Sequence, residues 1–445
     1  MTAKMHIGYD LSWTHLEGRW RLPGSWSHAT YPDLRIFKEV AVIAERGMLD
    51  FLFFGDGSGI PSTWKGSIAD AVRWGVGWPR LDMSPFIAAM SQVTQHIGFG
   101  LTYSSTFLPP YYVARLLNSL DHVTGGRIAF NVIASSRRAD AANYGFEDLM
   151  DHDDRYGRME EFMSVCNQLW ESVAPDAFIW DRETGVVADS SKVAAINHKG
   201  TFFSVKGPLA SVPSPQVKPV VVQAGASPRG IQASATFADM IFAANHDMSK
   251  RKKHRADLDA ALAAQGRDPA KVGIVWDEVL IVGETTEDAK RRHAHLLNAV
   301  PFEAVGAFMS HQIGYDLSKL PERFTTAEIN DVIVKSNASP VGFMNMTHEI
   351  DPNKEITRDE FYYHIKQHTG SYDHAVVGSA GEIADYLEEI FVETGERGGF
   401  MIAHPPGVPR DLLNVIDFLV PELQRRGRFR KAYAGSTLRE NLMDS

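Results

Sequence analysis

The chain has 445 residues, 44% of them hydrophobic, which supplies a large buried core and suits an α/β barrel with insertions. Its formal net charge of −10 and sequence pI of about 5.9 argue against a nucleic-acid partner. No apolar stretch reaches the ~18 residues needed to cross a membrane. No signal-peptide core opens the chain, and the single cysteine, Cys166, excludes an intrachain disulfide. We therefore expect a cytoplasmic enzyme.

Segments with the apolar character of buried strands alternate with helical patterns along the whole chain. Eight strand candidates begin near residues 5, 50, 97, 127, 219, 239, 272 and 399. Such alternation predicts an α/β fold with a parallel sheet, either closed into a (β/α)8 TIM barrel or open and doubly wound. Eight strands in one continuous chain favour the barrel. We expect a single domain, 1–445, with insertions after strands 2, 4 and 7, at about 55–83, 134–151, 173–218 and 299–370.

A long polar segment follows the fourth strand candidate. It ends at Asp151-His152-Asp153-Asp154-Arg155-Tyr156, which opens an amphipathic helix. Loops this long inside a compact chain are usually functional or disordered, and the aromatic and charged residues here favour function. His152 and Tyr156 are four residues apart and share one helix face, where the free backbone N–H groups also favour an anion. An ordinary capped helix start explains the same residues equally well.

Further candidates follow other strands, because barrel chemistry lies at the C-terminal ends of the strands. Strand 1 leads to His15, strand 2 to Asp56 and strand 3 to Thr102. Strand 5 ends in a glycine-rich turn beginning at Gly225, in which Ser227 would cap the next helix. Such a turn can cradle a phosphate with backbone N–H groups and a hydroxyl. Capped strand-to-helix turns without a ligand are nevertheless commoner.

Several cofactor motifs are missing, and the tryptophans are unevenly placed. No dinucleotide fingerprint, P-loop or nucleophile elbow is present, and strand 1 lacks the His-x-His of metal-dependent hydrolase barrels, so we expect no metal. Six of the nine tryptophans precede residue 80. They fall in loops expected over the barrel mouth, which predicts a largely apolar pocket with at least two of them on its wall. Packing of the insertions against the barrel is the alternative.

A set of short motifs occurs in order along nearly the whole chain. They are Thr14-His15, Glu45-Arg46-Gly47, Leu108-Pro109-Pro110-Tyr111, Gly125-Gly126-Arg127, Asn143-Tyr144-Gly145, His152-Asp153, Arg155-Tyr156, Gln223-Ala224-Gly225, Ser227-Pro228-Arg229-Gly230 and Leu438-Arg439. Together they resemble the flavin-dependent monooxygenases of the bacterial luciferase-like superfamily. Within it, the chain resembles the oxygenase components grouped with nitrilotriacetate, dibenzothiophene-sulfone and long-chain alkane monooxygenases.

This resemblance implies a reaction, a cofactor and partners. It implies an enzyme that uses reduced FMN (FMNH2) and O2 to insert one oxygen atom into a small, largely apolar organic substrate, through a flavin C4a-hydroperoxide. The reduced flavin would come from a separate NAD(P)H:FMN reductase, and the oxygenase would be a homodimer or homotetramer. The residues matched to flavin-contacting positions are Asp56, Thr102, His152, Tyr156 and Ser227.

The same resemblance suggests two residues for the chemistry. His15 and His311 are the candidates for hydrogen bonding or proton transfer beside the reacting oxygen. For His311, a surface position in the last insertion is an equally good interpretation. A deazaflavin (F420)-dependent dehydrogenase of the same superfamily and a non-redox metal hydrolase barrel stay open as alternative functions.

The chain departs from its relatives after strand 4. It has Ser135-Ser136-Arg137-Arg138 where related oxygenases often carry an asparagine. The two arginines either bind an anionic group of the substrate or reach the surface. A second histidine near Glu17 and a cysteine in the preceding loop are both missing, which argues against sulfone and alkane substrates respectively. Whether carbon, nitrogen or sulfur is oxygenated does not follow from the sequence.

Overall fold

Eight parallel strands close into a barrel in the computed structural model. The model describes residues 3–12, 21–22, 24–25, 32–135, 137–225, 227–245, 247–335, 343–344, 346–347, 349–366, 375–403 and 409–443. The barrel strands are β1 (His6–Asp10), β2 (Phe51–Phe54), β3 (Gly98–Ser104), β4 (Ile128–Ile133), β7 (Val220–Ala224), β8 (Met240–Ala243), β9 (Gly273–Gly283) and β13 (Gly398–Ala403). Neighbouring strands pair in this order, and β13 pairs with β1 to close the ring. The predicted barrel and its eight strand positions are confirmed.

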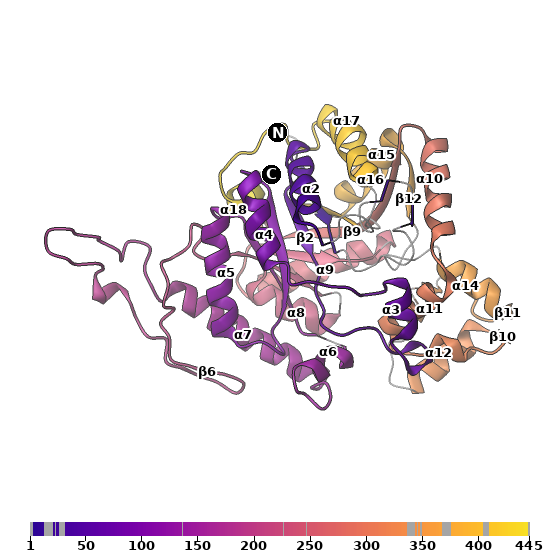
Figure 1. The fold of residues 1–445 in the computed structure, drawn as a ribbon, viewed down its shortest axis with the longest axis horizontal. Coiled ribbons are helices and arrows are strands. Elements are labelled where there is room, and N and C mark those ends of the chain that lie inside the picture. Colours follow the sequence, from indigo (N-terminus) through magenta and orange to yellow (C-terminus); the bar gives the residue numbers. More distant parts are fainter. Residues whose placement is uncertain are drawn as a thin grey trace.

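Helices follow the strands and surround the barrel (Figure 1). They include α2 (Leu34–Arg46), α4 (Ser84–Met90), α5 (Pro110–Thr124), α7 (His152–Glu171), α8 (Pro228–Phe237), α9 (Met248–Ala264), α10 (Thr286–Ala299) and α15 (Ala380–Glu393). Their apolar stripes face the strands: α2 buries Ile36, Phe37, Val40, Ala41 and Ala44, and the Asp33 side chain caps its N-terminus. The helical segment after β13 is divided into α16 (Pro409–Asn414), a π-helical turn (Val415–Leu419) and α17 (Val420–Arg425).

The C-terminal segment closes the bottom of the barrel, at the N-terminal ends of the strands. Leu438, which opens α18 (Leu438–Met443), packs among the inward side chains of the strands. A Cβ on Gly98 would lie 2.6 Å from Leu438 Cδ1, so only glycine leaves room for this plug. Buried Arg430 donates to the Asp50 carboxylate, which also contacts His6 Nδ1 at 2.9 Å. Among the described residues, this end of the barrel is therefore filled by side chains, and the predicted site residues lie toward the opposite end.

The insertions after β2 and β9 pack together into a second core. It joins η2 (Trp64–Gly66) and α3 (Ala69–Trp74) to α11 (Phe302–Ile313), α12 (Thr326–Lys335) and α14 (Arg358–Lys366). Trp64 is buried at its centre, and a Cβ on Gly306 would lie 2.4 Å from the Trp64 ring. Trp64 thus packs one insertion against the other instead of lining a pocket. Three of the six early tryptophans (Trp13, Trp20 and Trp26) lie outside the described residues.

Two details go beyond the elements predicted from the sequence. The polar segment after β4 contains a short helix, α6 (Arg138–Asn143). A further strand, β12 (Val376–Ser379), pairs in parallel with the C-terminal half of β9. A short hairpin, β5 (His198–Lys199) paired with β6 (Ser204–Val205), lies on an arm that extends away from the barrel (Figure 1).

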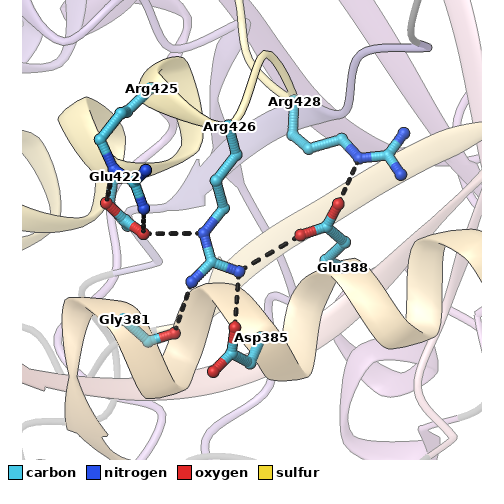
Figure 2. A network of polar contacts seen from close by, with 7 residues as sticks. All are labelled: Gly381, Asp385, Glu388, Glu422, Arg425, Arg426 and Arg428. Carbon is cyan, nitrogen blue, oxygen red and sulfur yellow. Dashed lines mark hydrogen bonds and ion pairs between the residues drawn. The ribbon is translucent and has the colours of Figure 1, made fainter.

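One arginine holds the last helices of the barrel in place (Figure 2). The guanidinium of Arg426 donates to Glu422 (2.8 Å), Asp385 (2.6 Å), Glu388 (3.2 Å) and the carbonyl oxygen of Gly381 (3.1 Å). Arg428 donates to Glu388 as well, at 2.7 Å. Because several charges share one network, this contact between α15 and α17 contributes more to stability than an isolated surface ion pair does. Within the described ranges, no helix has the length and apolar character of a membrane span.

Candidate functional site

The N-termini of α7 and α8 meet at the C-terminal ends of β4 and β7. His152 is the first residue of α7 and Tyr156 lies one turn later, with their ring centroids 5.0 Å apart. A Cβ on Gly230 would lie 3.1 Å from both the Tyr156 hydroxyl and Ser227 Oγ. The absence of a side chain at Gly230 therefore lets two hydroxyl groups from different helices approach the same small space.

Ser227 caps α8 as its position predicts. Its Oγ accepts a hydrogen bond from the backbone N–H of Gly230 at 3.0 Å. Arg229 forms a two-pronged ion pair with Glu160, at 2.7 and 2.8 Å, and its guanidinium lies 5.6 Å from the Tyr156 ring centroid. Because Glu160 neutralises the charge of Arg229, the arginine acts here mainly by packing against the Tyr156 ring and holding it in place. The seat for an anion then consists of two hydroxyls, an imidazole and the positive end of α8.

Two polar side chains lie inside the barrel, toward the C-terminal ends of its strands. Thr102 on β3 and Asn131 on β4 are neighbours in the strand register, and Asn131 Nδ2 donates to Thr102 Oγ1 at 3.0 Å. Both residues are buried, and Asn131 Oδ1 has no hydrogen-bond partner. An unpaired buried carbonyl oxygen is costly, so this position suits a ligand that offers an N–H donor.

Asp56 lies on the loop after β2, which is held by β1 and α6. Ser12 Oγ accepts from the backbone N–H of Gly55 at 2.7 Å, and Asp140 on α6 accepts from that of Gly59 at 2.6 Å. The Asp56 residue is exposed to solvent, yet the surrounding protein desolvates its carboxyl enough to raise its pKa. The positive charge of Arg80 acts in the opposite direction.

Arg137 and Arg138 point in different directions. Arg138 forms an exposed ion pair with Asp148 at 3.0 Å. Arg137 instead turns toward the loop after β2: a Cβ on Gly57 would lie 2.9 Å from Arg137 Nη1 and 2.7 Å from Arg80 Nη1. The sequence allowed these arginines either to bind an anionic group of the substrate or to reach the surface. The surface interpretation applies to Arg138 only.

His311 lies near the end of α11, within electrostatic range of the same two arginines. Burial and, to a smaller extent, the charges of Arg137 and Arg80 together lower its pKa from 6.5 to about 3. The imidazole is therefore neutral at pH 7, with one nitrogen that donates and one that accepts. The residue is half-buried, so it is not a simple surface histidine. His15, the other catalytic candidate, lies outside the described residues.

Comparison with known proteins identifies the family. Residues 19–398 match the luciferase-like monooxygenase family. The chain belongs to this family. It is 34% identical to component A of nitrilotriacetate monooxygenase from Aminobacter aminovorans, over 99% of this chain and 96% of that protein. The predicted enzyme class, a monooxygenase, is thereby confirmed.

Solved structures of luciferase-like monooxygenases and related enzymes share the fold. The crystal structure of a long-chain alkane monooxygenase superposes with a TM-score of 0.87 at 32% identity, over 99% of this chain and 96% of that one. A riboflavin lyase, crystallised with modified FMN and riboflavin, gives a TM-score of 0.86 at 28% identity, over the same shares of the two chains. The barrel of this chain is thus the one that these enzymes use.

Two residues of this luciferase-like site had no signal in the sequence. Arg80 lies in the insertion after β2 and Asp140 in α6, and neither belongs to a recognised motif. Asp140 reaches the loop around Gly57 because α6 packs on that loop, and Arg80 because the insertion after β2 folds back on itself. Their types, one arginine and one aspartate, are too common for sequence alone to distinguish them from surface charges.

Proposed function

We propose that this chain is the oxygenase of a two-component system that uses reduced FMN and O2 to insert one oxygen atom into a small organic substrate. The observation that carries this proposal is the seat formed by His152, Tyr156 and Ser227 at the α8 N-terminus. Its donors suit a terminal phosphate such as that of FMN. A relative crystallised with modified FMN supports the same cofactor.

The other residues of the site fit the flavin ring. Asn131 Oδ1 is an unpaired buried acceptor, and the ring system of FMN carries N–H donors. Thr102 holds the Asn131 amide in place, and Asp56 would be a further residue that holds the flavin. When bound in its reduced form, FMN supplies the electrons that activate O2. The protein binds and orients it, and the packed insertions keep water away.

His311 is suited to positioning a proton beside the substrate. Because its imidazole is neutral at pH 7, it can donate from one nitrogen and accept at the other without a change of charge. We propose this role for His311, and the same role for His15.

The partners follow from the same proposal. A relative named as component A indicates a second component, and we propose an NAD(P)H:FMN reductase in the cytoplasm. We also propose that 1–445 acts as a single domain and assembles into a homodimer or homotetramer. The arm between α7 and β7 exposes Ile179 (53%), Trp180 (63%) and Val187 (50%), which a second copy would cover.

Flavin titration followed by rapid mixing with O2 tests this function. The oxidised and reduced forms of FMN are titrated anaerobically into the purified protein. The reduced complex is then mixed with O2 in the presence of a substrate panel, and product is compared with uncoupled peroxide. Tight binding of reduced FMN and substrate-dependent product are expected. Reduction of deazaflavin without O2 uptake, or activity that depends on a bound metal, would instead favour the alternative functions.

A further inference from the structure

Three separate segments bring two arginines and a neutral imidazole close to one place above the barrel. Arg80 comes from the insertion after β2, Arg137 from the segment after β4 and His311 from α11, in the insertion after β9. The Nη1 atoms of the two arginines both lie within 3 Å of the Cβ position of Gly57. Every group that shifts the pKa of His311 lowers it, so no carboxylate offsets the arginine charges at the imidazole.

The two arginines differ in how their charges are balanced. Arg80 donates to the carbonyl oxygen of Gly57 at 3.0 Å, and the carboxylates of Asp56 and Asp140 act on it electrostatically. The side chain of Arg137 forms no hydrogen bond or ion pair with any residue in the described part of the chain. It is nevertheless half-buried rather than extended into solvent. A partly buried guanidinium without a partner is unfavourable unless a ligand provides one.

We propose that Arg137, with Arg80 beside it and His311 on the neighbouring insertion, binds a carboxylate of the substrate. The inference rests on the proposed monooxygenase function and narrows its substrate class to organic anions. A planar guanidinium matches a carboxylate with two parallel hydrogen bonds, and a neutral imidazole can add a third donor. This revises the expectation of a largely apolar substrate.

A single carboxylate suits this site better than a phosphate. Asp56 and Asp140 act electrostatically on Arg80, whereas the Arg137 side chain is not ion-paired with any described residue, so the site has room for about one further negative charge. A dianion would be repelled by the two neighbouring carboxylates. The FMN phosphate has its own seat, at His152, Tyr156 and Ser227. The two anion sites are therefore expected to respond to different substitutions.

The test compares Arg137→Gln with Arg138→Gln in the FMN-loaded enzyme. The probes are thioether and amine carboxylates, each paired with its uncharged amide, and binding is followed by calorimetry and by the flavin absorbance. Wild type should bind carboxylates more tightly than their amides. Arg137→Gln should raise the carboxylate dissociation constant roughly 10- to 100-fold and remove this preference. Arg138→Gln should leave the carboxylate dissociation constant and the preference over the amide unchanged, because Arg138 forms only an exposed ion pair with Asp148.

Further measurements separate the two proposals. Arg137→Lys should restore part of the carboxylate preference, and FMN affinity should stay within twofold of wild type in all three variants. Failure of the wild type to prefer any carboxylate over its amide would overturn the inference. So would loss of FMN binding in Arg137→Gln, which would assign the arginine to the flavin phosphate. Failure of the wild type to bind FMN at all would instead overturn the proposed function.

Discussion

Replacing Ser227 by alanine separates helix capping from cofactor binding. Its Oγ accepts from Gly230 N–H at 3.0 Å and faces the same space as the Tyr156 hydroxyl. Loss of the cap should lower the free energy of unfolding by about 1 kcal/mol. Loss of a hydroxyl donor to a charged phosphate should cost a further ~1.5–3 kcal/mol of binding. This corresponds to a roughly 10- to 100-fold weaker affinity for FMN.

The matched control is Thr285→Ala. Thr285 caps α10 in the same way, through Asp288 N–H at 3.2 Å, but α10 lies outside the proposed flavin site. Both variants should lose similar stability in urea unfolding, and only Ser227→Ala should lose FMN affinity in fluorescence titrations. If Ser227→Ala binds FMN within twofold of wild type while losing the same stability as the control, Ser227 is only a helix cap. The assignment of the phosphate seat would then be wrong.

Three further outcomes are expected. Tyr156→Phe keeps the ring contacts but removes the hydroxyl, so the FMN dissociation constant should rise roughly tenfold, and an unchanged titration would exclude the hydroxyl from the site. Arg430→Met leaves Asp50 buried without its main counter-charge and should lower the unfolding free energy in urea by about 3–5 kcal/mol. As a control, Arg46→Gln removes the exposed ion pair with Asp417 and should lower the unfolding free energy by less than about 1 kcal/mol. Equal losses of stability in Arg430→Met and Arg46→Gln would contradict this difference between buried and exposed ion pairs. Hydrogen bonds from two arginines lower the pKa of Glu422 from 4.5 to about 2, so its contribution to stability is present above pH 4.5 and is lost as the pH falls toward 2. The stability difference between wild type and Glu422→Gln should therefore shrink in acid, and a constant difference from pH 7 to pH 3 would refute this.

Sequence patterns predicted the structure most accurately where that structure depends only on residues that are neighbours in the chain. Continuous apolar runs such as 51–54 must be buried on both faces, and they predicted the parallel strands correctly. Ser227 before Pro228 predicted a helix N-cap, because capping depends only on the next three residues. The helix inside the segment after β4 and the π-helical turn in the last helix were not foreseen, since neither has a distinctive local signature.

The sequence by itself determined the eight parallel strands, the family resemblance and the candidates at the strand ends, because period, capping and motif order are properties of contiguous residues; it favoured the closed barrel, and the pairing of β13 with β1 decided it. Only the tertiary structure decided that Arg137 turns inward while Arg138 pairs with Asp148, and that Arg80, Arg137 and His311 meet. The tertiary structure also assigned Trp64 to packing between insertions. These contacts join segments far apart in the chain, so they depend on how the loops pack and not on the residues beside them in sequence.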